Sequence, residues 1–256
     1  MRLVLDIGNS RLKWLSEDAR TGAGSAHLHT PIIHNQNFLM AFKDIQNELQ
    51  SAGRTRTVDV ITIGSVTADK TDISKVCQEL WCVEPTYVCS TSTACGVKNS
   101  YAEPSKLGVD RWAAMGEAFC QAQSAVCVFD LGSAFTIDAV NTNGHHLGGY
   151  ILPGLSMSRD SVTGGTSQVM VDEEHFDKAQ PVWGRSTNAA VNNGIIYTAV
   201  TLIQNAIKNL RLELKMPVEA FITGGDAAKI LPFVNDLVRY DENLVLKGIK
   251  RLADSM

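Results

Sequence analysis

The chain has 256 residues, of which 45% are hydrophobic, and this is enough for one large domain or two smaller ones with packed cores. A formal net charge of -4 without a long basic run argues against nucleic acid as the main partner. No apolar run is long enough to span a bilayer, and Asp6 interrupts the first apolar run, so neither a membrane segment nor a signal peptide is expected.

Hydrophobic periodicity predicts alternating strands and helices in the first half of the chain, which is the pattern of an open α/β sheet. The first half is expected to form strands over 3–5, 13–15, 57–66 and 85–89 and helices over 37–49 and 72–81. The second half is expected to form a helix from residue 109, strands over 126–129, 135–140, 145–152 and 218–222, and a long helix over 189–212. The polar, glycine-rich stretch 159–187 is expected to be mobile.

The first predicted strand ends in a turn whose residues suit a phosphate. Asp6 closes the strand, and Gly8, Asn9 and Ser10 follow it. Because Gly8 has no side chain, a phosphate could approach the backbone N–H groups, and Asp6 could hold a divalent cation directly or through its water shell. A hairpin turn with one solvated Asp explains the same residues and is the simpler interpretation of this segment alone.

The same pattern returns half a chain later. The apolar strand at 126–129 ends in Asp130, and Gly132 and Ser133 follow before another alternating strand. Two copies of strand, Asp, Gly, Ser and strand indicate an internal duplication. Two such hairpins facing each other across a cleft could grip the two ends of a polyphosphate.

Residues 108–111 open the helix that is predicted from residue 109. Asp110 could act as a general base beside Arg111, a cation that can bind a carboxylate. Alternatively, Asp110 caps the helix and Arg111 is a surface partner, which is the favoured interpretation if the stretch is taken alone.

A Gly224-Gly225 turn follows the strand at 218–222 and precedes a helix. Such a turn lets a nucleotide approach the N-terminus of the helix. An ordinary tight turn between a strand and a helix is equally compatible with these two glycines.

No metal site is expected from the histidines and cysteines. His145 and His146 are adjacent on a strand and therefore point to opposite faces, with no Cys or carboxylate suitably placed beside them. The six cysteines contain no C-x-x-C pair, and several lie in apolar periodic stretches. Buried free thiols in a reducing cytoplasm are therefore favoured over zinc ligands or disulfides.

Taken together, five motifs resemble the ordered signatures of type III pantothenate kinases, a family of the acetate and sugar kinase/actin-like ATPase superfamily. They are LDIGNS at 5–10, GVDRW at 108–112, DLGSAFT at 130–136, LGGYILPG at 147–154 and FITGGDA at 221–227. The resemblance spans nearly the whole chain, and the set is more specific than any single motif. Ser10 and Ser133 stand where the family often has Thr, and Phe135 is bulkier than the family pattern suggests.

The resemblance implies an α/β fold of two duplicated actin-like, ribonuclease-H-like domains that flank a nucleotide cleft. The first domain would span 1–116, with the first phosphate loop and the substrate loop. The second would span 117–256, with the second phosphate loop, the adenosine motif and a dimerisation helix. The functional unit would be a cytoplasmic homodimer.

The activity implied by the resemblance is ATP-dependent phosphorylation of pantothenate to 4'-phosphopantothenate, the first step of coenzyme A biosynthesis, with Asp110 as the base. The implied ATP-binding residues are Asp6, Ile7, Gly8, Asn9, Ser10, Arg11, Leu12, Lys13, Ser133, Gly224 and Gly225. The implied pantothenate-binding residues are Tyr101, Gly108, Val109, Asp110, Arg111 and Thr187, the last acting across a dimer interface. Asp6 would hold Mg²⁺ through water, and Asp130 would bind a monovalent cation, K⁺ or NH₄⁺.

Two other functions remain open at this point. One is a kinase of the same superfamily with another small hydroxylated substrate, which the stretch from Tyr101 to Arg111 argues against through resemblance. The other is a nucleotide-binding regulatory protein that has lost turnover, which the acids Asp6, Asp110 and Asp130 argue against.

Overall fold

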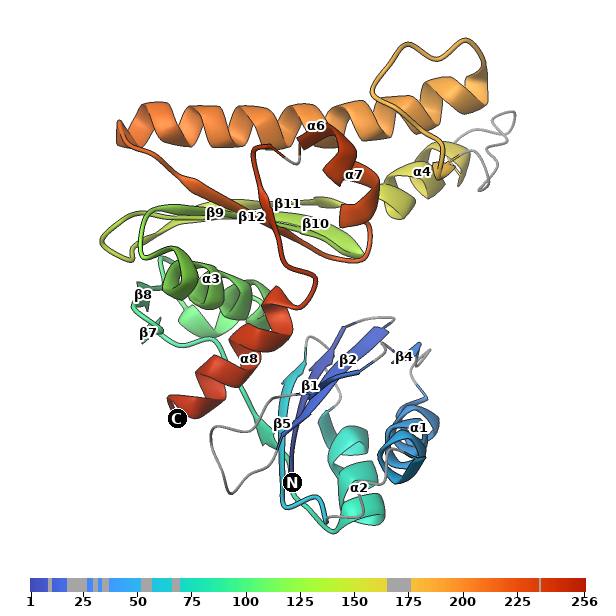
Figure 1. Cartoon of the computed structure of the whole chain (residues 1–256), viewed down its shortest axis with the longest axis vertical. Coiled ribbons are helices and arrows are strands. Elements are labelled where there is room, and N and C mark those ends of the chain that lie inside the picture. Colours follow the sequence, from blue (N-terminus) through green and yellow to red (C-terminus); the bar gives the residue numbers. More distant parts are fainter. Residues whose placement is uncertain are drawn as a thin grey trace. The chain divides into compact units, whose positions relative to one another are not determined.

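The computed structural model describes residues 1–8, 11–17, 27–29, 32–33, 37–51, 57–65, 70–164, 176–234 and 236–256 (Figure 1). The chain divides into two compact units. The first unit contains Met1–Cys95, Tyr101–Glu117 and Leu244–Met256, and the second contains Gly96–Ser100 and Ala118–Asn243. In the part of the chain described, no helix has the length and apolar character needed to cross a membrane.

The first unit is built on a sheet with the strand order β3-β2-β1-β5-β6, in which β4 also pairs with β2. The strands are β1 (Arg2–Ile7), β2 (Arg11–Glu17), β3 (His27–Leu28), β4 (Ile32–Ile33), β5 (Val60–Ser65) and β6 (Thr86–Tyr87). Strand β1 is antiparallel to β2 and parallel to β5, and β5 is parallel to β6. This places β1 in the middle of the sheet, which explains its continuous apolar run.

Helices cover both faces of the first sheet. Helices α1 (Phe38–Ser51) and α2 (Lys70–Trp81) lie on one face, and α8 (Leu244–Asp254) contacts β1 and β5 on the other (Figure 1). Phe42 and Ile45 of α1 and Ile73 of α2 share a buried cluster with Leu3 and Leu5 of β1. Both amphipathic helices were predicted from the helical spacing of these apolar residues.

The second unit repeats this topology. Its sheet has the order β11-β10-β9-β12-β13, with β9 (Val126–Leu131), β10 (Ala134–Val140), β11 (His146–Pro153), β12 (Glu219–Thr223) and β13 (Arg239–Tyr240). Strand β9 is antiparallel to β10 and parallel to β12, as β1 is to β2 and β5. Helices α4 (Leu155–Gly164), α6 (Thr187–Leu214) and α7 (Ala227–Val234) contribute to its core. The predicted duplicated α/β fold is therefore confirmed.

The remaining elements connect the two sheets along the chain. They are the short strands β7 (Thr93–Ala94) and β8 (Val97–Lys98), the 3₁₀ turn η1 (Pro104–Lys106) and helix α3 (Val109–Ala122). The partition into two units divides α3 after Glu117.

Two segments differ from what the sequence suggested. Part of the stretch 159–187, expected to be mobile, belongs to helix α4, while residues 165–175 lie outside the described part of the chain. The serines and threonine of α4 obscure any apolar period, and the helix packs against α6. The last helix, α8, packs against the first sheet, although the domain boundary predicted from the sequence placed residues 117–256 in the second domain. The predicted boundary between residues 116 and 117 stays a prediction.

The cysteines match their prediction only in part. None of the six forms a disulfide, and Cys77 and Cys127 are buried, whereas Cys82 and Cys89 are exposed. Burial, together with the smaller effects of the Glu84 charge on Cys77 and the Asp138 charge on Cys127, raises the pKa of both thiols to about 12. These two thiols therefore stay protonated at neutral pH.

Candidate functional site

The turn between β1 and β2 carries the first predicted phosphate loop. Asp6, at the end of β1, is paired in register with Lys13 of β2 and with Gly64 of β5. The N–H of Gly8 donates to the carbonyl oxygen of Arg11 at 3.0 Å and closes the turn. Asp6 and Lys13 are each half-buried, so a carboxylate and an ammonium group are presented together at the carboxyl end of the central strand.

Not every residue predicted to bind ATP offers a side chain. Ile7 and Leu12 are fully buried in the core of the first unit, so they could offer ATP only their backbone groups. Arg11 is exposed. Asn9 and Ser10 lie outside the described residues.

The second hairpin has the same construction. Asp130, near the end of β9, is paired in register with Thr136 of β10 and Thr223 of β12. The N–H of Gly132 donates to the carbonyl oxygen of Ala134 at 3.0 Å. Ser133 at the tip is exposed, and its hydroxyl is therefore accessible to a ligand.

Gly224 brings the turn after β12 against this hairpin. Its φ is +98°, and a Cβ there would lie 2.4 Å from the backbone of Leu131 and 2.6 Å from Oδ1 of Asp130. The N–H of Asp226 donates to the carbonyl oxygen of Leu131 at 3.0 Å. Only glycine fits this close approach in the left-handed region, so the predicted residues Asp130 and Gly224 are brought together.

Sequence reasoning did not assign Gly154 to the site, although it lies in one of the five motifs. A Cβ on Gly154 would lie 2.4 Å from the carbonyl oxygens of Gly132 and Ser133, and its N–H donates to Ser133 at 3.1 Å. The Pro-Gly break after β11 could have revealed it, because such a break permits close backbone contact.

The first turn of α3 carries the predicted base. The carbonyl oxygen of Gly108 accepts from the N–H of Trp112 at 3.0 Å, and Oδ1 of Asp110 accepts from the N–H of Arg111 at 2.8 Å. Asp110 is half-buried in the first turn, where the helix dipole favours a negative charge. The helix-start role and a role as base are compatible, because a carboxylate has further lone pairs to offer. Val109 is 8% exposed and belongs to the core.

Tyr101 and Arg111 form a pair in the same unit. Nη1 of Arg111 donates to the hydroxyl of Tyr101 at 3.0 Å, and the guanidinium carbon lies 5.9 Å from the centre of its ring. Arg111 is only 6% exposed, so the pair is held in one geometry rather than moving freely in solvent. The structure thus brings together Tyr101, Gly108, Asp110 and Arg111, four of the residues that the resemblance implies for pantothenate.

Thr187 is the first residue of α6 and is exposed. Ser186 caps the helix, since its hydroxyl oxygen accepts from the N–H of Ala189 at 3.1 Å. Trp183, four positions before Thr187, is 98% exposed. Thr187 is therefore a surface residue of the second unit.

Among the described residues there is no group of three or more His, Cys, Asp or Glu side chains that could hold a metal ion. The expectation that no carboxylate lies beside the two histidines was wrong, because Oδ1 of Asp138 is 3.1 Å from Nε2 of His146. The contact joins β10 to β11, and strand register was needed to reveal it.

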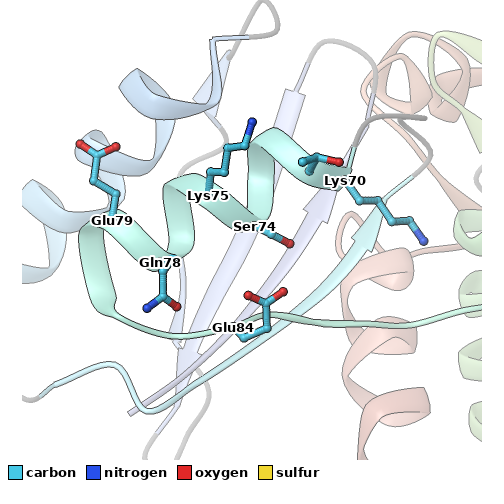
Figure 2. Close-up of a pocket in the computed structure, with 7 residues that line it drawn as sticks. Lys70, Ser74, Lys75, Gln78, Glu79 and Glu84 are labelled. Atoms are coloured by element: carbon cyan, nitrogen blue, oxygen red, sulfur yellow. The ribbon is translucent and has the colours of Figure 1, made fainter.

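A surface cavity of about 680 Å³ lies along α2 (Figure 2). Its lining residues are Lys70, Thr71, Ser74, Lys75, Gln78, Glu79 and Glu84. The Tyr87 hydroxyl, next to it, is 3.1 Å from the Ser74 hydroxyl and donates to the carbonyl of Lys70 at 3.0 Å. Charges of both signs line the cavity, and none of the predicted site residues does.

The two sheets have the same strand order, and the first strand of each carries an Asp-x-Gly hairpin; solved structures share this fold. A candidate 2-dehydro-3-deoxygalactonokinase from Sinorhizobium meliloti has a similar fold, with a TM-score of 0.57 and 9% identity, covering 100% of this chain and 97% of its own. A Campylobacter jejuni protein described as a candidate Baf family transcriptional activator has a TM-score of 0.60 at 21% identity, covering 99% and 98% of the two chains.

The family follows from sequence comparison. Residues 2–209 match the family model for type III pantothenate kinase. A type III pantothenate kinase of Alcanivorax borkumensis is 34% identical over 256 residues, which cover 99% of this chain and 98% of the relative. The chain belongs to the type III pantothenate kinase family.

Proposed function

We propose that the protein transfers the γ-phosphoryl group of ATP to the primary hydroxyl of pantothenate, which forms 4'-phosphopantothenate and opens coenzyme A biosynthesis. Family membership supports the reaction. The observation that carries it to this chain is the Tyr101–Arg111 pair beside Asp110, in a chain that keeps both Asp-x-Gly hairpins. A kinase for another substrate would keep the hairpins without needing that pair.

Phosphate binding is assigned to the two hairpins. Asp6 and Lys13 would bind and orient the phosphates at the Gly8 turn, and the turn at Gly224 and Gly225 would lie beside the adenosine. The exposed Ser133 hydroxyl would donate to a phosphate oxygen. Because phosphoryl transfer depends mainly on positioning and charge stabilisation, pre-formed turns of this kind are the useful contribution of the fold.

Asp110 would be the general base. The hydroxyl proton of pantothenate passes to its carboxylate, the oxygen forms a bond to the γ-phosphorus, and the bond to the leaving ADP oxygen breaks. Arg111 would bind the substrate carboxylate or another acceptor, and Tyr101 holds the guanidinium in place. Gly108 and Val109 would contribute backbone groups, since Val109 is buried.

The cations fit the residues present. Mg²⁺ usually keeps several waters and binds to proteins through one or two carboxylates together with phosphates, so the single carboxylate of Asp6 suits it. Asp130 lies against the turn at Gly224, where a carboxylate and backbone carbonyl oxygens are close together. Such hard oxygen donors suit K⁺ or NH₄⁺, which would offset phosphate charge.

A cytoplasmic homodimer is part of the proposal. The almost fully exposed Trp183, four positions before Thr187, and the exposed Tyr197 of α6 support a partner surface near Thr187. None of the six cysteines forms a disulfide, although two of them are exposed, which suits a reducing compartment.

A coupled assay of ADP release with pantothenate and Mg²⁺, run in K⁺ and then in Na⁺, tests the function. We expect turnover that requires pantothenate and K⁺. If ATP binds without pantothenate-dependent turnover, the substrate assignment is wrong, and other hydroxylated acceptors become the next candidates.

A further inference from the structure

The segment Gly96–Ser100, which we call the strap, is held along the turn between β10 and β11 in the second unit. The N–H of Lys98 donates to the carbonyl oxygen of Gly144 at 2.7 Å, and Lys98 forms a parallel bridge with His145. Gly144 has a φ of +75°, and a Cβ there would lie 1.9 Å from the carbonyl oxygen of Gly96. Only glycine permits this contact, so the strap has one docked position.

A chain of side-chain hydrogen bonds fixes the end of the strap. The hydroxyl of Ser100 is 3.1 Å from Nδ1 of His146, and Nε2 of His146 is 3.1 Å from Oδ1 of Asp138. The carboxylate can only accept, so Nε2 carries a proton, and in the neutral ring Nδ1 accepts from the Ser100 hydroxyl. The chain runs from β10 through β11 to the strap.

Burial gives this chain a defined geometry. The side chains of His146 and Asp138 are 0% and 3% exposed, whereas Ser100 is exposed. A buried carboxylate and imidazole are costly to leave unpaired, so the pair holds its ring orientation firmly. Ser100 is thus tied to a rigid group, although it lies at the surface.

The strap ends where the proposed substrate-binding segment begins. The chain passes from the second unit to the first between Ser100 and Tyr101, and Tyr101 accepts from Arg111. We propose that Ser100, His146 and Asp138 are positioning residues for the kinase reaction, which set the backbone position of Tyr101 and through it the orientation of Arg111 toward pantothenate. This proposal rests on the proposed function, because it assigns pantothenate to Tyr101 and Arg111.

Steady-state kinetics of Ser100→Ala test the proposal, since Ser100 is exposed and the variant should fold normally. We expect the KM for pantothenate to rise about threefold to tenfold, the effect of one lost hydrogen bond, with the KM for ATP and the melting temperature unchanged. Ser100→Thr keeps the hydroxyl and should restore the wild-type KM. Thr142→Ala removes an exposed hydroxyl from the same turn and should change nothing.

Hydrogen exchange supplies a readout that does not depend on the substrate. In the protein without ligands, Ser100→Ala should speed exchange severalfold in peptides covering 99–108, and Asp138→Asn should do the same. Unchanged exchange together with an unchanged pantothenate KM would overturn the proposal. If exchange speeds up while Tyr101→Phe leaves the pantothenate KM unaffected, the strap acts as described but the substrate assignment of the proposed function is wrong.

Discussion

Asp6 and Asp130 occupy the same position in two sheets of the same topology. Each lies near the carboxyl end of the central strand, each pairs in register with one residue of an antiparallel neighbour and one of a parallel neighbour, and each precedes a glycine whose N–H closes the turn. The parallel partner is Gly64 for Asp6 and Thr223 for Asp130. Two sheets of equivalent topology thus carry carboxylates whose surroundings differ, and the different cations proposed for Asp6 and Asp130 depend on that difference.

Replacing Asp110 with Asn should abolish the base while leaving the phosphate-binding turns intact. We expect turnover to fall by about 10²–10⁴-fold, the usual contribution of general base catalysis. ATP affinity should stay within about twofold, because Asp6 and Gly224 are unchanged. Initial rates and titration calorimetry with a non-hydrolysable ATP analogue measure the two quantities.

The matched control for this variant is Glu103→Gln, which neutralises an exposed acid between Tyr101 and Asp110 and should keep full activity. Wild-type turnover by Asp110→Asn would remove Asp110 as the base. If Asp110→Asn lowers the melting temperature and Glu103→Gln does not, the result would instead favour a structural role of Asp110 at the start of α3.

Replacing Asp130 with Ala should remove the response to potassium. The ratio of the rates in K⁺ and in Na⁺ should fall toward one, because the variant lacks the carboxylate that would hold the ion against the Gly224 turn. Glu213→Ala removes an exposed acid of α6 in the same unit and should preserve the ratio. An undiminished K⁺ to Na⁺ ratio in Asp130→Ala would refute the ligand role.

Gly224→Ala should destabilise the protein and weaken ATP binding together. The new Cβ would meet the Leu131 backbone at 2.4 Å with φ at +98°, and strain of this kind costs about 1–3 kcal/mol. Gly194→Ala is the contrasting variant, because Gly194 lies within α6 with nothing within 4 Å of a new Cβ, and it should gain about 0.5–1 kcal/mol. Urea unfolding of both variants measures the difference, and equal stability would contradict the close approach at Gly224.

Periodicity was sufficient for most of the fold because β1, β9, α1 and α6 bury a regular apolar pattern. It failed for α4, because serines and a threonine interrupt the apolar pattern of this helix. In the structure α4 packs against α6. It also gave no sign that α8 joins the first sheet, since that pairing connects the two ends of the chain.

The candidate site followed a similar rule. Residues close in sequence, such as Gly108, Asp110 and Arg111, could be recognised as one group. Contacts between distant segments could not: the approach of Gly154 to Ser133 and the pairing of His146 with Asp138 require the register of β10 and β11. The burial of Ile7 and Leu12 likewise depends on the strands that flank β1 and β2 on each side in the sheet.

Acid should weaken the attachment of α8 to the first sheet. Lys250 lies 2.7 Å from Asp254 and 3.3 Å from Glu17, and Arg2 pairs with both acids. Burial raises the pKa of Asp254, but hydrogen bonds from Lys250 and Arg2 more than offset this, so its pKa is below the ordinary value. Its contribution to stability is therefore present above about pH 4 and is lost as the pH falls through the lowered pKa.

Thermal unfolding of the wild type and Asp254→Asn between pH 3 and pH 8 measures this contribution. The wild type should melt about 1–3 °C higher at neutral pH, since exposed ion pairs contribute little, and the difference should shrink as the pH falls below about 4. The pKa of Lys250 shifts the other way: burial lowers it, but Asp254 and Glu17 raise it overall above its ordinary value. The contribution of Lys250 to stability is therefore present below its ordinary pKa and is lost as the pH rises through the raised pKa. A difference that stays constant from pH 8 to pH 3 would exclude the ionised carboxylate as its source.

Thr187 should act on the pantothenate site of a partner subunit. Light scattering is expected to give the mass of a dimer, and Thr187→Val should raise the pantothenate KM severalfold without changing that mass. Thr198→Val, on the same helix, should leave the pantothenate KM unchanged.

Subunit mixing tests whether Thr187 acts on its own subunit or on the partner. A mixed dimer of Asp110→Asn and Thr187→Val subunits holds one site with both wild-type residues if the contact crosses the interface. After subunit exchange, an equal mixture should therefore recover about a quarter of wild-type sites at low pantothenate, because half of the dimers are mixed and each has one intact site of two. Activity no greater than the average of the two separate variants would place Thr187 in its own subunit's site or outside it, and a fully active monomer would remove it from any shared site.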